Sequence, residues 1–149
     1  MFIWTVSALL AATCYGQALD TWKMIPAKSR HSTGPLAKAI TANYEARSGA
    51  EIWTFYQVGS DGMSETTSQT LRFDGKEYPC GDLGLEDRPD TVVSRKLDAQ
   101  TAEVSYKKSG RVTRRVLRTL SADGKRMTLE VHITPEKGPA VERWLVFER

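Results

Sequence analysis

Three arginines stand in segments where their side chains would share a face with hydrophobic neighbours. In RVTRRVLRTL, residues 111–120, a two-residue period points Arg114 and Arg118 in the same direction as the aliphatic side chains. In VERWLVFE, residues 141–148, the same period places Arg143 on the face of its hydrophobic neighbours. A buried guanidinium needs a carboxylate, a carbonyl, water or a bound anion as its partner. The chemistry that these residues could do is therefore anion binding inside a water-containing cavity.

A second interpretation of the same arginines is structural. A twist or a bulge in the strand would carry their side chains to the rim of the sheet, where they would pair with acids on other strands. The sequence leaves both interpretations open.

Catalytic chemistry is poorly supported. The chain has two histidines, His31 in a loop-like stretch and His132 on the polar face of a strand, and no Cys-His spacing suits a metal. No Gly-x-Ser-x-Gly is present, and several aspartates stand in turns that they themselves stabilise. Two carboxylates from distant strands could still meet. We predict no enzyme activity, no cofactor and no metal site.

A basic stretch, KKSGRVTRRVLRTL at residues 107–120, could lie along phosphates. Stacking on single strands would need interleaved aromatic residues, whereas the interleaved residues here are valine and leucine. The net charge of +3 is also small. We therefore predict no nucleic-acid partner.

The elements that must position these residues are β-strands. Polar and apolar residues alternate, and Asp-Gly or Ser-Gly pairs mark tight turns at 48–49, 61–62, 74–75, 109–110 and 123–124. Besides a short strand at Trp22, the pattern predicts strands at residues 40–47, 51–58, 64–73, 91–97, 102–107, 111–120, 126–134 and 141–148. Many strands joined by tight turns predict an all-β fold, an antiparallel up-and-down barrel of about eight to ten strands.

Three segments depart from simple alternation. Residues 27–39 contain Gly34-Pro35 and predict a loop with one helical turn. Residues 80–90 predict a second loop, of the kind that covers a barrel mouth. EIWTFYQV, residues 51–58, is apolar on both faces, which is typical of a strand that is covered on its second side or lies at an interface.

The first 18 residues carry no charge, and their apolar run is too short to span a bilayer. The tripeptide ending at Ala18 matches a signal-peptide cleavage pattern. We predict a signal peptide at 1–18, a single domain at 19–149, export to the periplasm or the extracellular space, and no transmembrane span. Lipidation at Cys14 is an alternative, although the residues before it form a poor lipobox. Cleavage would leave only Cys80, and hence no internal disulfide.

TWKM, residues 21–24, resembles the Gly-x-Trp segment that opens the first strand of lipocalins and the Gly-Thr-Trp-Lys-Leu segment of fatty-acid-binding proteins, with Asp20 in place of the glycine. More of the chain is similar to a family of uncharacterised small exported bacterial proteins with a lipocalin-like, calycin-type β-barrel. The matching motifs occur in the same order and are Trp22-Lys23-Met24, Ala27-Lys28-Ser29, Thr33-Gly34-Pro35, Phe73-Asp74-Gly75-Lys76-Glu77-Tyr78-Pro79 and Asp123-Gly124-Lys125-Arg126-Met127-Thr128. This resemblance implies a fold and a compartment, and no activity. The lipocalin resemblance implies that an arginine near the end of the barrel packs on Trp22 and closes one end, with Arg143 as the positional candidate.

Together these observations predict a barrel that binds a small hydrophobic or amphipathic molecule, anionic if the arginines contact it, without catalysis. Tyr44, Tyr56 and Tyr106 are the candidate ligand contacts besides the three arginines. The alternative is a protein interaction or self-association module, without a ligand, that uses the strand around Trp53 and Phe55. We expect a monomer.

Overall fold

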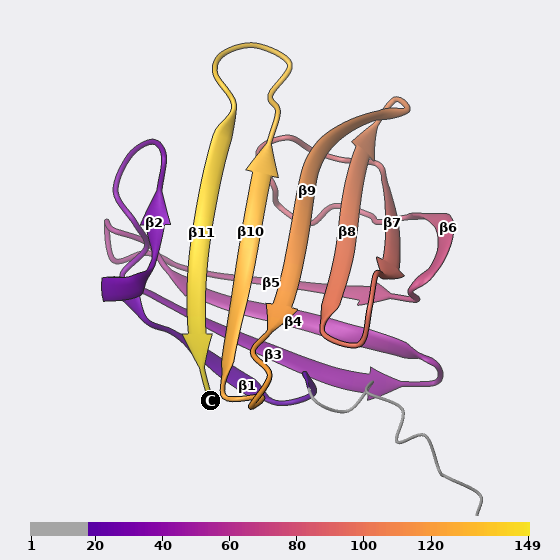
Figure 1. Ribbon diagram of the computed structural model, residues 1–149. Coiled ribbons are helices and arrows are strands. Elements are labelled where there is room, and N and C mark those ends of the chain that lie inside the picture. Colours follow the sequence, from indigo (N-terminus) through magenta and orange to yellow (C-terminus); the bar gives the residue numbers. More distant parts are fainter. Residues whose placement is uncertain (1–17) are drawn as a thin grey trace, which may run out of the picture.

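The computed structural model describes residues 18–149, so the predicted signal peptide, apart from Ala18, lies outside the described residues. These residues form one antiparallel sheet of eleven strands (Figure 1). The elements are β1 (Thr21–Met24), the short 3-10 helix η2 (Pro26–Lys28), β2 (Arg30–His31), β3 (Ala39–Arg47), β4 (Ala50–Val58), β5 (Ser64–Leu71), β6 (Asp74–Pro79), β7 (Thr91–Lys96), β8 (Thr101–Lys108), β9 (Arg111–Leu120), β10 (Arg126–Ile133) and β11 (Val141–Glu148). Within the described range, no helix has the length and hydrophobicity needed to cross a membrane.

The strands follow one another around the sheet in up-and-down order. The hydrogen-bonded order is β5-β4-β3-β1-β11-β10-β9-β8-β7-β6, with β2 paired to β11. In Figure 1, β1, β3, β4 and β5 run behind and across the direction of β7 to β11, so the sheet curls round on itself. The predicted fold class, an antiparallel up-and-down all-β fold, is confirmed. Within residues 18–149 the two end strands, β5 and β6, are not paired with each other and are joined by Arg72 and Phe73.

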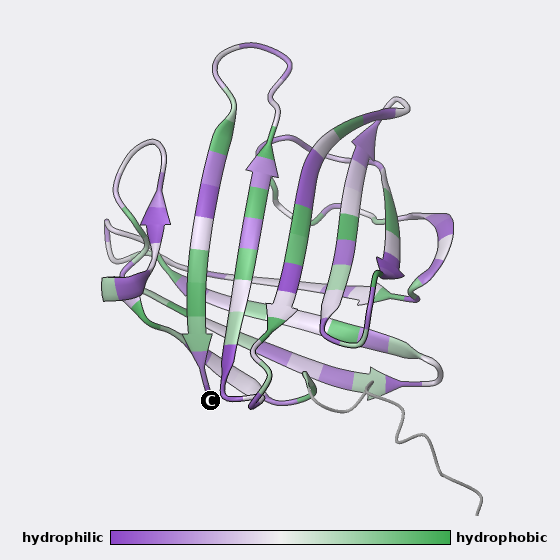
Figure 2. Cartoon of the chain, viewed as in Figure 1, coloured by the Kyte–Doolittle hydropathy of each residue, from purple (hydrophilic) through white to green (hydrophobic). Residues whose placement is uncertain are grey.

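Alternation along the strands places the core on the inner face of the curl. Figure 2 shows hydrophobic and hydrophilic residues taking turns along β9, β10 and β11. The largest fully buried side chains include Trp22, Trp53 and Phe147. Ser109-Gly110 forms one of the tight hairpins, because its φ angles of 50° and 80° are those of a type I′ turn.

The predicted turn at Asp74-Gly75 is not a hairpin. These residues begin β6, which the sequence did not predict as a strand, and β6 pairs with β7 rather than with the preceding β5. All but one of the six β6 residues are exposed, so the strand has no core face to produce alternation. Phe73, just before it, has a φ of 54° and turns the chain from one end of the sheet to the other.

A bulge in β9 changes which side chains point inward. The register between β8 and β9 shifts between Tyr106 and Lys107, which leaves Thr113 as an additional residue on β9. Thr113 is buried and Val112 is 43% exposed, so Val112 does not share the inward face with Val116 and Leu120. Arg114 lies beyond the bulge and keeps the inward direction predicted from the period of two, because its side chain is 11% exposed and lines the interior of the curled sheet.

Candidate functional site

The curled sheet encloses a central cavity of about 220 Å³. Its hydrophobic walls come from opposite parts of the sheet and include Phe55, Val116, Leu129, Leu145 and Phe147. Its polar lining consists of Gln57, Glu65, Thr67, Gln69, Glu86, Tyr106, Arg114 and Arg143. Apolar walls with a few placed polar groups are the usual composition of a small-molecule site.

Arg114 and the loop at 80–90 meet at the edge of this cavity. Nη2 of Arg114 donates to Oδ1 of Asp87 at 2.8 Å, and the hydroxyl of Thr113 donates to Oδ2 of the same carboxylate at 2.8 Å. The bulge therefore lets two consecutive residues of β9 hold one loop carboxylate. Nε of Arg114 is buried and has no hydrogen-bond partner among the described residues.

Arg143 lies on the other side of the cavity mouth, where β2 pairs with β11. Its Nε donates to Nε2 of His31 at 3.0 Å, which requires a neutral imidazole with a free lone pair. Burial and the nearby Arg143 charge lower the pKa of His31. Burial, together with Arg114, also lowers the pKa of Arg143, while Glu86 and Asp87 oppose this shift. Arg114 and Arg143 thus bring two positive charges to one region.

The loop at 80–90 covers the cavity, as predicted. Leu83, Gly84, Leu85 and Glu86 contribute to its lining, and Asp87 anchors the loop to β9. The Cys80 thiol donates to the carbonyl oxygen of Pro89 at 3.3 Å across the base of the loop. Burial raises the pKa of Cys80, so the thiol is protonated and structural.

Below the central cavity, Arg118 lies in a compact cluster of charged and aromatic side chains. Its side chain is 3% exposed, and its Nη1 donates to Oε2 of Glu51 at 2.9 Å. Nζ of Lys96 donates to the other oxygen, Oε1, at 2.8 Å, and the indole N–H of Trp53 donates to Oε2 at 2.8 Å. The Arg118 guanidinium lies 4.6 Å from the ring centroid of Trp53 and 4.8 Å from that of Tyr44.

These contacts decide the ionisation of the cluster. Burial by itself would raise the pKa of the Glu51 carboxyl, but the Arg118 charge and the hydrogen bonds from Arg118, Lys96 and Trp53 lower it overall. Burial also lowers the pKa of Lys96, and the Arg118 charge adds to this. Glu51 is therefore ionised, and it holds the two cations together.

The inward arginines combine features of both interpretations. Arg114 and Arg118 point inward, as the period of two predicts, and each is paired with a carboxylate there, as the structural interpretation requires. Arg143 also lines the cavity, and its hydrogen bond goes to His31.

The predicted tyrosines separate into three environments. Tyr106 lines the central cavity, and its hydroxyl donates to Oε1 of Gln69 across the interior. Tyr44 is buried in the aromatic cluster, outside the cavity lining, and its hydroxyl has no partner among the described residues. Tyr56 is 52% exposed, so it cannot contact a ligand in the central cavity.

Two other predictions are corrected by the contacts. The cation over Trp22 is Arg149, at 4.7 Å from the ring centroid, whereas Arg143 lies at the mouth against His31. Trp53 is 1% exposed and packs against Phe55, which is half-buried, so the Trp53 side chain offers no surface to a partner. Trp53 is therefore excluded from the predicted Trp53/Phe55 interaction surface, and the use of this strand by a partner stays a prediction.

Sequence reasoning missed Glu51, Lys96 and Asp87. Glu51 could have been found, because the period of two places it on the same face as Trp53. Asp87 lies in a loop, where no periodicity indicates direction. Lys96 lies in a predicted strand in which Val92 and Val93 make both faces apolar, so the sequence does not decide which face is buried. Among the described residues, no group of three or more His, Cys, Asp or Glu side chains could hold a metal.

No protein-family model matches the chain, and no curated protein does. Among solved structures, the chain is similar to zebrafish ileal bile acid-binding protein complexed with cholic acid, with 10% identity, a TM-score of 0.52, and coverage of 89% of this chain and 99% of that one. It is also similar to lobster apocrustacyanin A1, with 12% identity, a TM-score of 0.46, and coverage of 91% and 62%. The fold is lipocalin-like. At these identities the likeness shows the fold alone, and the bacterial family and the export remain predictions.

Proposed function

We propose that this protein is an exported binding protein that holds a small amphipathic molecule with an acidic group in its central cavity, without catalysing a reaction. The observation that carries the proposal is the cavity of about 220 Å³, which has hydrophobic walls and two arginines in its lining. The similar bile acid-binding structure is complexed with cholic acid, which supports a hydrophobic acid as the class of ligand.

The polar groups suit an acid better than a neutral ligand. Nε of Arg114 is buried and lacks a partner among the described residues, and Nε of Arg143 is bonded to a neutral histidine rather than to a carboxylate. A ligand carboxylate near both would gain charge-assisted hydrogen bonds. The cavity is smaller than the roughly 300–1,000 Å³ of drug-sized sites, so we propose a medium-chain acid of about ten carbon atoms.

Calorimetric titration with decanoate and with decanol tests this proposal. Decanoate is expected to bind at least about tenfold more tightly than decanol, because a hydrogen bond to a charged group contributes about 1.5–3 kcal/mol. Arg143→Met should remove this preference, with Arg114→Met as a second variant. Arg115→Met is the matched control, because Arg115 lies on the outer face beside Arg114 and pairs with Glu103.

Equal affinity for decanoate and decanol, or a preference that survives in both cavity variants, would rule out the acid-binding part. No binding of either compound would rule out the cavity as the site. Native mass spectrometry of protein isolated from its own periplasm would identify the natural ligand, and cell fractionation would test export.

A further inference from the structure

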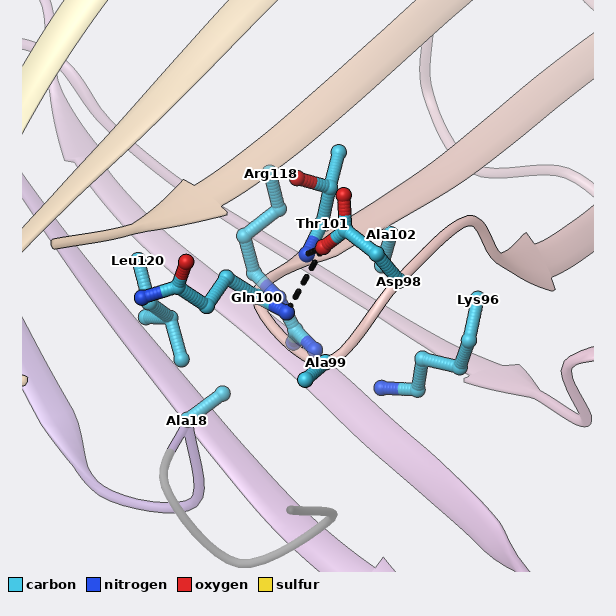
Figure 3. Close-up of a pocket in the computed structure, with 9 residues that line it drawn as sticks. All are labelled: Ala18, Lys96, Asp98, Ala99, Gln100, Thr101, Ala102, Arg118 and Leu120. Atoms are coloured by element: carbon cyan, nitrogen blue, oxygen red, sulfur yellow. Dashed lines mark hydrogen bonds between the residues drawn. The ribbon is translucent and has the colours of Figure 1, made fainter. Parts of the chain in front are cut away.

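A second cavity, of about 160 Å³, lies at the end of β9 that carries Arg118 and Leu120 (Figure 3). Small or aliphatic side chains form much of its wall: Ala99, Ala102 and Leu120, together with Ala18, which the predicted cleavage would remove. Lys96 and Arg118 also line it, and Figure 3 shows both pointing into the space beside the β7–β8 turn. It therefore combines an apolar wall with two cations.

The two cations are held in place by one carboxylate. Arg118 binds Oε2 of Glu51 and Lys96 binds Oε1 of the same group. Each cation also lies over an aromatic ring, Arg118 over Trp53 at 4.6 Å and Lys96 over Phe73 at 4.0 Å. Because these contacts fix both side chains, an incoming anion would meet donors that are already oriented.

A purely structural role does not account well for this cluster. Hydrophobic residues of similar volume often replace a buried ion pair at no loss of stability, so burying two cations here is weak evidence for a stabilising role. Charged groups with shifted pKa values beside a cavity, as Glu51 and Lys96 are, are more typical of binding sites.

The acid in the cavity wall, Asp98, is hydrogen-bonded to the backbone of the β7–β8 turn. Oδ1 of Asp98 accepts the backbone N–H groups of Gln100 and Thr101, at 2.8 and 2.7 Å, and so shapes the turn (Figure 3). Its carboxylate is thus committed to the turn at the edge of the cavity, while Ala99 and Ala102 leave the space open.

We propose that this cavity is a second, separate binding site, for a small carboxylate with a hydrophobic body, whose acidic group binds Arg118 and Lys96. The volume matches an engineered cavity of about 150 Å³ that holds one benzene ring. Trp53 separates the two sites, because it lines the central cavity and covers Arg118.

Titration with benzoate, followed by NMR, tests the second site. Benzoate should shift the Trp53 indole N–H and the Arg118 Nε–H resonances in a saturable manner, and the neutral isostere benzamide should not. Lys96→Met should weaken benzoate binding at least about tenfold, because a charge-assisted hydrogen bond is lost. Ala99→Leu should have a similar effect by filling the cavity while it leaves both cations in place.

Two control variants distinguish binding in this cavity from binding at the protein surface and from binding in the central cavity. Arg95→Met removes a cation from the same strand, but Arg95 faces outward and pairs with Glu103, so benzoate should bind as before. Arg143 does not line the second cavity, so Arg143→Met should also leave these shifts unchanged. The proposal is overturned if benzoate does not bind, if it binds Lys96→Met and Ala99→Leu as tightly as the parent protein, or if only Arg143→Met abolishes binding.

Discussion

At the scale of single residues, substitution of Glu51 is expected to have the largest effect on the protein. Its side chain is buried, and it accepts hydrogen bonds from two cations and one indole. Removing one partner of a buried ion pair leaves an uncompensated charge, which costs far more than the pair itself contributes. Loss of the Glu51 charge should therefore destabilise the interior more than the loss of any other single charge.

We expect Glu51→Gln to lower the free energy of unfolding by about 3 kcal/mol, measured by urea denaturation. The matched control is Glu77→Gln, since Glu77 is exposed and pairs with Lys107, and should cost less than about 1 kcal/mol. Adding Lys96→Met to Glu51→Gln should restore part of the lost stability. Equal effects of the two glutamine variants would contradict the assignment of Glu51 as the carboxylate that neutralises the buried cations.

His31 should make stability depend on pH. Its pKa is lowered from 6.5 in the folded protein, chiefly by burial and then by Arg143, so the unfolded chain binds the proton more readily. Stability should therefore fall as the pH drops below about 6.5, and level off once the folded-state pKa is passed. His31→Gln keeps an acceptor for Arg143 but cannot titrate. Urea unfolding at several pH values should show a smaller loss of stability in this variant; identical profiles would exclude His31 as the cause.

At the scale of elements, the loop at 80–90 and the bulged strand β9 work as a pair. The loop contributes cavity wall, and β9 provides the hydroxyl and the guanidinium that hold Asp87. These two bonds hold the loop against β9. Loops with few anchors open locally, at a free energy well below that of global unfolding.

Asp87→Asn should therefore loosen the loop. We expect amide hydrogen exchange in residues 80–90 to accelerate about tenfold or more, because a charge-assisted hydrogen bond contributes about 1.5–3 kcal/mol, while exchange in β10 stays unchanged. Asp82→Asn serves as the control, since Asp82 accepts the N–H of Gly84 within the same loop. Acceleration that is equal in both variants would show that Asp87 is not the anchor.

At the scale of the whole molecule, the beginning of the described chain is part of the barrel core. Ala18 is buried, and its carbonyl accepts the indole N–H of Trp22 at 2.9 Å. The opposite end of the chain returns to the same tryptophan, because Arg149 lies over its ring. Trp22 therefore ties both ends of the described chain together.

A chain that starts at Leu19, the predicted mature end, should be less stable than one that starts at Ala18. The expected loss is about 1 kcal/mol, because the Trp22 indole loses its acceptor. Thermal unfolding of both chains measures the difference. In a Trp22→Phe background the donor is absent, so the two chain lengths should then unfold alike; a persistent difference would assign the loss to another contact.

The sequence predicted most of this architecture, because strands with one buried face show alternation and Ser-Gly pairs mark their turns. The prediction failed where a strand lacks a buried face or where its alternation is interrupted. β6 has almost no buried face, and the extra residue at Thr113 shifts the phase of β9 without a compositional signal. The partner of Trp22 could not be predicted from Arg143 being next to Trp144, because contacts across a curled sheet depend on register rather than on sequence neighbours.

The bulge at Thr113 also bears on how this chain would vary in evolution. In a strand without the bulge, only Arg114 would bond to Asp87. The additional residue, Thr113, provides the second hydrogen bond. Removing that residue would shorten β9 by one position and remove the hydroxyl that anchors the loop. In homologous chains, a one-residue gap at this position should therefore accompany the loss of the acid at position 87.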